Sequence, residues 1–223
     1  MRRMTPVLLS LGVLLAASAW TAPAAGAAPQ ADRSVAVPSG WEKVDVDELA
    51  EIAEGTPARK APLVVGDDVS TQAEEPELLA VQSLRNGKFV ATEKSYPAPD
   101  TGAVRARSDA YNGSWEGFAF EWDESSETYA LKSLANNRYV AVEKNYTGAA
   151  QNMLRARSTS AGGWERFALY YNDSLDRWAL QSTLNGLFVT MENSYTGSLQ
   201  YVLRARSAAI SGWEEFSLYG LDA

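Results

Sequence analysis

The sequence predicts an all-β protein in which one four-stranded unit occurs three times, and three observations lead to this prediction. First, each unit closes with the motif Trp-Glu-x-Phe, and the motif tryptophans, Trp115, Trp164 and Trp213, lie 49 residues apart. Second, apolar residues within a unit recur at every second position, which is the period of a β-strand. Third, pairs of Asn and Gly residues follow the first apolar run of each unit, and such pairs are typical of turns.

The first unit shows how the four strands follow one another. Its apolar runs are residues 79–82, 89–92, 104–107 and 115–120. The turn pairs of the three units are Asn86-Gly87, Asn136-Asn137 and Asn185-Gly186. They predict two-residue hairpins, because Asn and Gly accept positive φ at low steric cost. Four strands in each of three units give about twelve strands in total.

A unit of four short strands cannot cover its own apolar face, so the three units must share one core. A β-propeller also uses four-stranded units, but it generally needs at least about four blades. Three units therefore predict a β-trefoil, with repeats at 78–127, 128–176 and 177–223. The predicted core residues are Leu131, Val140, Ala156, Trp164, Phe167 and their counterparts in the other repeats.

Residues 1–27 have the features of a secretory signal peptide. Arg2 and Arg3 form a basic start, residues 7–17 form a short apolar core, and residues 25–27 are small, as signal peptidase requires. The apolar core is shorter than the roughly 20 residues of a membrane-spanning helix. We therefore expect a secreted, extracellular protein that does not insert into a membrane.

Residues 28–77 carry most of the acidity of the chain. They contain twelve acidic and four basic residues, whereas residues 78–223 contain sixteen acidic and fourteen basic residues. Trp41 is the only aromatic residue of this segment, which therefore has too little apolar surface to fold alone. We predict a mostly disordered acidic linker with one short helix that Asp45 caps and that ends before Gly55. A more specific interpretation is a pro-segment or an arm that docks a protein partner.

The composition excludes several kinds of chemistry. The 223 residues include no cysteine and no histidine, and the net charge is −8. Ser-His-Asp and Cys-His nucleophiles, disulfides and Cys/His zinc sites are therefore absent. A pI of about 4.7 argues against nucleic acid as a partner, because nucleic acid requires a clustered basic face. We expect no cofactor, no metal and no nucleic-acid partner.

Three stretches of the second repeat resemble the fascin-like branch of the β-trefoil proteins. They are residues 131–143 (LKSLANNRYVAVE), 154–157 (LRAR) and 164–167 (WERF). The other repeats carry related residues, so the resemblance covers 78–223, whereas the Gln-x-Trp motif and the disulfides of the ricin-type branch are absent. The resemblance implies a non-enzymatic binding module, which bundles actin in animals and accompanies polysaccharide-degrading enzymes in exported bacterial proteins. A cysteine-free chain with an alanine-rich signal favours the bacterial kind, and therefore a polysaccharide or glycan partner.

The candidate ligand-binding residues recur with one spacing in every repeat. They are Glu93, Tyr96, Arg105, Glu143, Tyr146, Arg155, Glu192, Tyr195 and Arg204. A carboxylate, an aromatic face and a guanidinium suit a shallow site for sugar hydroxyls, or for the carboxylate or sulfate groups of an acidic glycan. The structural alternative is that arginine pairs with glutamate while tyrosine packs against its strand. Pro97 and Pro99 predict that the first repeat differs from the other two.

These observations predict a secreted, non-catalytic module that binds polysaccharide through up to three pseudo-equivalent rim sites. One alternative is a protein-binding trefoil, such as a protease inhibitor that presents the loop with Pro97 and Pro99. Another is an actin-binding module like fascin. A glycosidase with two carboxylates needs no histidine, but a filled trefoil core leaves no deep cleft. We therefore predict that the protein is not an enzyme.

Overall fold

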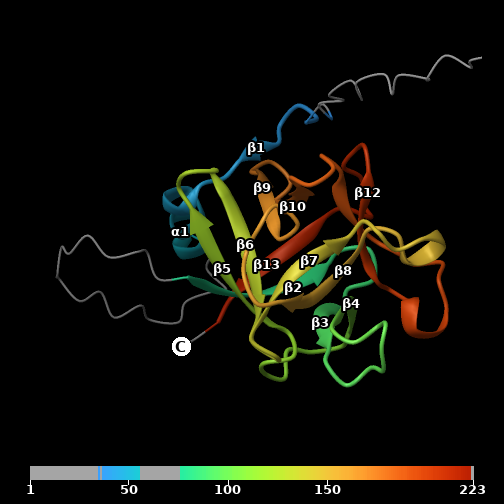
Figure 1. The fold of residues 1–223 in the computed structure, drawn as a ribbon. Coiled ribbons are helices and arrows are strands. Elements are labelled where there is room, and N and C mark those ends of the chain that lie inside the picture. Colours follow the sequence, from blue (N-terminus) through green and yellow to red (C-terminus); the bar gives the residue numbers. More distant parts are fainter. Residues whose placement is uncertain (1–34, 36, 56–75, 222–223) are drawn as a thin grey trace, which may run out of the picture. The chain divides into compact units, whose positions relative to one another are not determined.

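The computed structural model describes residues 35, 37–55 and 76–221. In this part of the chain, a short strand and a helix precede twelve further strands, four in each repeat (Figure 1). The number of strands in the repeats and their even distribution agree with the periodicity of the sequence.

The strands of the repeats have the following bounds. Repeat one contains β2 (Glu77–Ser83), β3 (Phe89–Glu93), β4 (Ala103–Ser108) and β5 (Gly117–Asp123). Repeat two contains β6 (Thr128–Ser133), β7 (Arg138–Glu143), β8 (Met153–Ser158) and β9 (Arg166–Asn172). Repeat three contains β10 (Arg177–Ser182), β11 (Phe188–Met191), β12 (Leu203–Ser207) and β13 (Phe216–Gly220). The short 3-10 turns η1 (Gly148–Ala150) and η2 (Gly197–Leu199) lie in repeats two and three.

The first and fourth strands of the three repeats close into a six-stranded barrel. Neighbouring strands pair antiparallel in the order β2, β5, β6, β9, β10 and β13. The ring closes because β13 returns to β2, from Phe216 opposite Ser83 to Gly220 opposite Leu79. Closure removes the long unpaired edges that an open sheet would expose.

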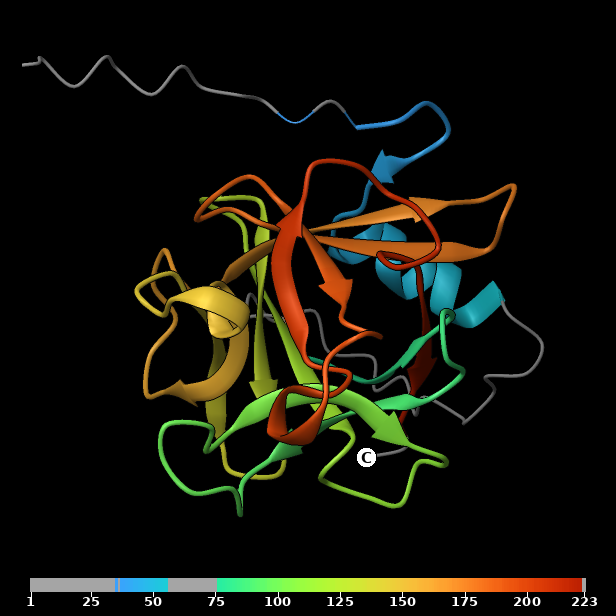
Figure 2. The ribbon, with the colours of Figure 1, turned by 90° about the vertical axis from the view of Figure 1, so that its right-hand side faces the viewer.

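The second and third strands of each repeat form a hairpin at one end of the barrel. The third strands also contact one another, at Ala103–Arg155, Met153–Arg204 and Arg105–Val202. These contacts form a triangle around a pseudo-threefold axis. Figure 2 views this end of the barrel, with the three hairpins arranged around a common centre.

Residues at equivalent positions of the repeats fill the barrel in layers. Phe118, Phe167 and Phe216 come from the fourth strands and are at most 1% exposed. Other equivalent sets in this core are Val81, Leu131 and Leu180; Val90, Val140 and Val189; and Ala106, Ala156 and Ala205. Burial of one such Phe contributes roughly 1.5–3 kcal/mol to folding. The prediction of a shared core is confirmed for these residues.

The motif tryptophans are not part of this core, so the prediction that they are core residues is wrong. Trp115, Trp164 and Trp213 are half-buried. The reason is that each tryptophan lies in the connection before the fourth strand, since β5 begins at Gly117. The Trp115 carbonyl accepts a hydrogen bond from Thr92 N at 2.9 Å, which holds the residue beside the hairpin.

The turns between the first two strands are longer than the two residues predicted. In repeat two, residues 134–137 connect β6 to β7. The positive φ is present as expected, at 55° for Asn137. Asn136 fixes the turn through its side chain, whose Nδ2 donates to the Ala156 carbonyl at 2.8 Å. Asn136 Oδ1 accepts from Arg138 N at 3.2 Å, so one amide joins the turn to the third strand.

Part of the acidic segment packs against the barrel, which differs from the mostly disordered linker predicted for 28–77. β1 (Glu42–Lys43) pairs antiparallel with β9 at Tyr171 and Tyr170. The reason lies in the register of β9, which pairs with β6 only at Phe167 and Arg166. The later residues of β9 therefore offer an edge, and β1 occupies it.

The helix expected in this segment is present as α1 (Val46–Gly55). Asp45 caps it, since Asp45 Oδ1 accepts from Glu48 N at 3.0 Å and Glu48 Oε2 accepts from Asp45 N at 3.2 Å. Val44 and Leu49 are 3% and 1% exposed and belong to the barrel core. Figures 1 and 2 place α1 over one end of the barrel, and the hairpins lie at the opposite end.

The predicted signal peptide, residues 1–27, and most of the predicted linker after α1, residues 56–75, lie outside the described residues. Within the described ranges, no helix has the length and apolar character that a membrane crossing requires.

We expect Leu49→Ala to lower the free energy of unfolding by about 2–5 kcal/mol, because it leaves a cavity where α1 meets the core. Asp47→Ala on the same helix is the control, since Asp47 is exposed and its loss costs less than about 1 kcal/mol. Urea denaturation followed by tryptophan fluorescence measures both values. Equal effects of the two substitutions would show that α1 does not seal the barrel.

Candidate functional site

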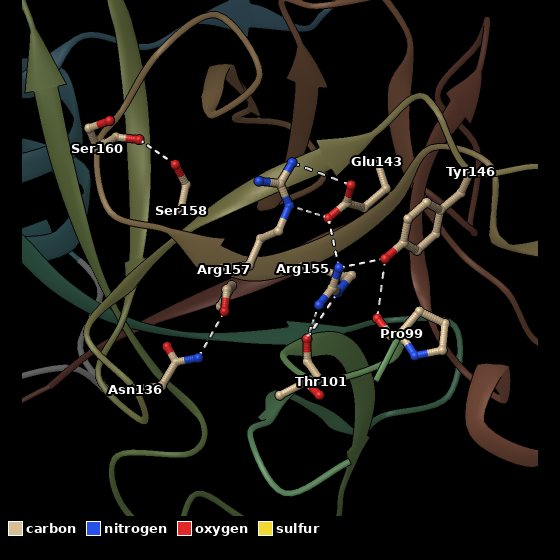
Figure 3. Close-up of polar contacts among 10 residues, drawn as sticks. Pro99, Thr101, Asn136, Glu143, Tyr146, Arg155, Arg157, Ser158 and Ser160 are labelled. Carbon is tan, nitrogen blue, oxygen red and sulfur yellow. Dashed lines mark hydrogen bonds and ion pairs between the residues drawn. The ribbon is translucent and has the colours of Figure 1, made fainter. Parts of the chain in front are cut away.

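A buried glutamate in each repeat holds two arginines of the neighbouring strand. In repeat two, Glu143 ends β7 and is 4% exposed. Arg155 and Arg157 lie on one face of β8, with the buried Ala156 on the other face. Glu143 Oε1 accepts from Arg155 Nη1 at 3.1 Å and from Arg157 Nε, and Oε2 accepts from Arg157 Nη2 at 3.3 Å (Figure 3). The hydrogen bond to Glu143 raises the pKa of Arg157 above its usual value.

The other repeats contain the same arrangement. The corresponding sets are Glu93 with Arg105 and Arg107, and Glu192 with Arg204 and Arg206. The three carboxylates are at most 4% exposed. The side chains of the first arginines are 7–13% exposed, whereas those of the second arginines are 35–44% exposed. Only the second arginine of each pair therefore reaches solvent to a large extent.

The loop tyrosine of each repeat lies against the first arginine. Arg155 Nη1 donates to Tyr146 OH at 2.6 Å, and the guanidinium carbon lies 5.7 Å from the ring centroid. The same contacts join Tyr96 to Arg105 and Tyr195 to Arg204. All nine candidate residues therefore come together, as three Glu-Arg-Tyr clusters. Their contacts are those of the structural alternative, and binding of a ligand by these residues stays a prediction.

Each first arginine also joins its repeat to a neighbouring repeat. The three hydrogen bonds run from Arg155 Nε to Thr101 O at 2.9 Å, from Arg204 Nε to Gln151 O at 2.7 Å and from Arg105 Nε to Gln200 O at 2.6 Å. The three acceptors occupy equivalent positions, so the bonds form a closed cycle around the axis. Ala103, Met153 and Val202, each 0% exposed, fill the centre of this cycle.

An equivalent residue at the start of the third strand of each repeat takes a positive φ: it directly precedes β4 and β8 and lies two residues before β12. The values are 82° for Gly102, 59° for Asn152 and 61° for Tyr201. A Cβ on Gly102 would lie 2.5 Å from the Ala156 carbonyl oxygen, so repeat one requires glycine here. Ala156 N donates to the Gly102 carbonyl at 2.8 Å, and equivalent bonds join Ala205 N to the Asn152 carbonyl and Ala106 N to the Tyr201 carbonyl.

Cations lie over the indole rings of the half-buried tryptophans. Lys144 Nζ is 5.2 Å and the Arg157 guanidinium carbon 5.7 Å from the Trp164 ring centroid. Trp115 has the equivalent contacts with Lys94 at 5.1 Å and Arg107 at 5.8 Å. Repeat three has Asn193 in place of the lysine, and there Arg85 lies 4.7 Å from the Trp213 ring. Cation–π attraction thus holds the indoles of repeats one and two beside their Glu-Arg-Tyr clusters, whereas the indole of repeat three contacts a cation of repeat one.

We use the name rim cluster for the Glu, the two Arg, the Tyr and the Trp of one repeat. The loop around the tyrosine is exposed at Lys144, Asn145 and Thr147. A rim cluster can therefore offer hydrogen-bond donors, a cation and aromatic edges to a polar ligand. In the part of the chain that the structure describes, acidic residues form no group that could hold a metal ion.

The loop of repeat one differs from the other two, as Pro97 and Pro99 lead one to expect. Repeats two and three carry η1 and η2, and their N-cap residues Thr147 and Thr196 have almost the same φ, −120° and −123°. Repeat one has no 3-10 turn among its described residues. Its loop is closed by Thr101 Oγ1, which donates to the Tyr96 carbonyl at 2.7 Å.

The sequence interpretation missed two features of the rim clusters. It placed the tryptophans in the core, and it assigned no role to Lys94 and Lys144. The signal for the lysines was available, because Lys94 and Lys144 directly follow the repeated glutamates. No local signal marks Arg85, which comes from the turn of a different repeat.

Comparison with known proteins reveals likeness in structure. The sequence matches no protein-family model and no curated protein sequence. The designed threefold-symmetric protein ThreeFoil matches with a TM-score of 0.53 and 17% identity, over 65% of this chain and 99% of its own. The Macrolepiota procera ricin B-like lectin, solved with lactose, matches with a TM-score of 0.51 and 10% identity, over 68% of this chain and 100% of its own.

A part of a Clostridium perfringens endo-β-galactosidase also matches, with a TM-score of 0.50 and 11% identity, over 66% of this chain and 33% of its own. Other lectins and a protein described as a β-trefoil are among the matched structures. At these identities the likeness concerns the fold. Together with the closed barrel and its three hairpins, it shows that residues 78–221 form a β-trefoil.

We expect Glu143→Gln to lower the free energy of unfolding by about 3–5 kcal/mol, because it leaves two arginines without their buried counter-charge. Glu127→Gln is the control, since it removes the exposed pair of Glu127 and Lys43 and costs less than about 1 kcal/mol. Chemical denaturation at neutral pH measures both values. A loss below 1 kcal/mol for Glu143→Gln would contradict the structural role assigned to the carboxylate.

Proposed function

We propose that this protein is a secreted, non-catalytic module that binds polysaccharide through its three rim clusters. The observation that carries this proposal is the threefold repetition of an aromatic and cationic cluster at one end of a β-trefoil. Lectins among the proteins of similar fold, one of them solved with lactose, support the same class of function.

Within a rim cluster, buried and exposed groups have different tasks. Arg155 already donates to Glu143, to Tyr146 OH and to the Thr101 carbonyl, so Glu143 and Arg155 position the loop. The groups that a sugar can reach are the partly exposed Tyr146, Arg157 and Trp164. An aromatic edge beside a guanidinium donor suits a sugar ring with its hydroxyl groups. Of the candidate residues, we therefore assign direct contact to the tyrosines and positioning to the glutamates and first arginines.

The threefold arrangement provides a reason for multivalent binding. A shallow, partly exposed cluster binds one sugar unit weakly. When one polymer engages two clusters, the second contact forms at a high effective concentration, and avidity exceeds the affinity of one site by about 10²–10⁴-fold. Repeats two and three have matching loops, so we propose that they act as the main pair.

Catalysis is not part of this proposal. A glycosidase needs two carboxyl groups that flank the scissile bond and reach the substrate. The repeated glutamates are 3–4% exposed and paired with arginine, which does not suit that task. Protein binding is the alternative that the exposed residues Pro97, Ala98 and Pro99 favour, because repeat one alone presents such a loop.

Binding to insoluble polysaccharides tests the proposal. We expect the mature protein to be retained on at least one of cellulose, chitin, xylan and an anionic glycan. Tyr146→Ala or Tyr195→Ala should weaken retention at least tenfold, and the double variant at least a hundredfold, because it removes the avidity of paired sites. Tyr111→Ala is the control, since Tyr111 is 42% exposed and lies outside the three clusters.

Two outcomes of this experiment would contradict the proposal. One is retention on no polysaccharide, together with inhibition of a serine protease that Pro97→Ala or Pro99→Ala abolishes, which would establish the protein-binding alternative. The other is an equal loss of retention in Tyr111→Ala and in the tyrosine variants, which would move the site away from the rim.

Secretion is tested separately. We expect a bacterium that expresses the full chain to release a protein that begins at Ala28, because residues 25–27 precede the predicted cleavage site. N-terminal sequencing or intact mass of the protein in the medium measures this. Retention of residues 1–27 in a cell-bound protein would contradict secretion.

A further inference from the structure

One place on the barrel departs from the threefold symmetry, next to the turn between the first two strands. In repeat one, Gln82 Nε2 donates to the Gly87 carbonyl at 2.8 Å, and Gln82 Oε1 accepts from Tyr219 OH at 2.8 Å. The ring of Tyr219 lies 5.5 Å from the ring of Phe89, between centroids. A glutamine and two rings therefore fill this place in repeat one.

Repeat three is filled in the same way. Gln181 Nε2 donates to the Gly186 carbonyl at 2.8 Å, and Gln181 Oε1 accepts from Tyr170 OH at 3.0 Å. The Tyr170 and Phe188 ring centroids are 5.8 Å apart. The N-terminal residues Val35, Val37 and Trp41 pack around these two rings, so the place is also covered.

Repeat two has different residues at all of these positions. Glu121 lies opposite Ala130, in the register that places Tyr219 opposite Ala80 and Tyr170 opposite Ala179. Lys132 stands where the other repeats have glutamine, Asn137 where they have glycine, and Tyr139 where they have phenylalanine. Two of these substitutions, Glu121 and Lys132, introduce a charge, and the other two, Asn137 and Tyr139, add a polar group.

The substituted side chains form a new network. Tyr139 OH donates to Glu121 Oε2 at 2.7 Å. Lys132 Nζ is 3.8 Å from Glu121 Oε1 and 5.2 Å from the Tyr139 ring centroid. The hydrogen bond to Glu121 raises the pKa of Tyr139 to about 12, because the carboxylate accepts from the protonated phenol and so stabilises it.

A hollow lies beside this network, and Lys132 and Tyr139 of the network form part of its lining. Its volume is about 350 Å³, within the lower part of the range of roughly 300–1,000 Å³ for small-ligand sites. It is open to solvent, and its lining residues are Lys132, Asn136, Asn137, Arg138, Tyr139 and Thr159.

The hollow also has a cation whose acidic counterpart is missing. In repeat one, Lys88 pairs with Asp109. The equivalent residues are Arg138 and Thr159 in repeat two, so the cation is kept and the acid is replaced by a hydroxyl. Lys132 and Arg138 together exceed the single charge of Glu121, which gives this pocket a positive balance on a chain of net charge −8.

We propose that this repeat two pocket binds an anionic sugar unit, either a uronate or a sulfated sugar. The planar guanidinium of Arg138 matches the two oxygens of a carboxylate or sulfate group. Asn137 and Thr159 are exposed at the same opening and offer an amide and a hydroxyl to the sugar hydroxyls. The pocket is separate from the rim clusters, and its ligand need not be a polymer.

Titration with short oligosaccharides tests this site. The probes are a trimeric galacturonate, a sulfated galactose oligomer and a neutral galactose trimer, measured by calorimetry on the mature wild-type protein. We expect one of the two anionic probes to bind and the neutral trimer to bind at least tenfold more weakly. The anionic probe that binds identifies the source of the negative charge.

Two variants locate the binding. Arg138→Ala should weaken binding of the anionic probe at least tenfold. Lys88→Ala in repeat one is the matched control and should leave the affinity unchanged. Arg138 is exposed, so its loss does not threaten the fold. The triple variant Glu121→Tyr, Lys132→Gln and Tyr139→Phe rebuilds the filling of the other repeats and should abolish binding at an unchanged melting temperature.

The proposal is overturned if neither anionic probe binds, or if Lys88→Ala lowers the affinity for the probe as much as Arg138→Ala does. It is also overturned if the folded triple variant binds the probe with wild-type affinity. Tyr146→Ala distinguishes this failure from a failure of the rim sites. Loss of the anionic probe in Tyr146→Ala but not in Arg138→Ala would move the ligand to the rim. Retained binding of the probe in Tyr146→Ala, with lost retention on polysaccharide, would support both sites.

Discussion

Three buried carboxylates hold the hairpin end of this β-trefoil together. A buried charge is tolerated only when nearby groups compensate for its lost hydration, and here each glutamate is bound by two guanidiniums. The first of these guanidiniums also reaches a carbonyl of a neighbouring repeat. Because the three bonds of this kind form a closed cycle, the position of each rim loop depends on the repeats beside it. The tyrosines and tryptophans of the rim are therefore presented by a frame that exists only when all three repeats are folded.

Positions that are the same in all three repeats and positions that differ between repeats are subject to different structural constraints. Layers such as Phe118, Phe167 and Phe216 repeat because a closed barrel needs the same volume from each repeat. In the loops and at partly exposed positions of the barrel strands, one repeat can change without disturbing the layers. The proline-containing loop of repeat one and the repeat two pocket are both changes of this kind. A recognition site that occurs once can therefore be built on a scaffold that occurs three times.

Much of the fold could be predicted because the three repeats can be aligned with one another, so that each structural position occurs three times in one sequence. The period of two placed the strands, and the spacing of the glutamates, tyrosines and arginines identified the residues that meet at the rim. The burial of the tryptophans could not be predicted, because an indole that carries a cation on its face has the same sequence pattern as a core residue. The packing of Val44 and Leu49 was also missed, since the acidic composition around them hides two apolar residues that meet a barrel formed far along the chain. Tyr201, with its positive φ, follows no rule of sequence and is set by the cycle of contacts around it.

The closing strand β13 has a consequence for how the chain acquires its structure. Tyr219 and Gln82, which meet across the seam between β13 and β2, are 137 residues apart. Contacts between such distant residues slow folding, because the intervening chain must be ordered first. While the protein is being synthesised, β2 keeps an unpaired edge until β13 has emerged. The ring of strands therefore shuts only after all three repeats have been synthesised.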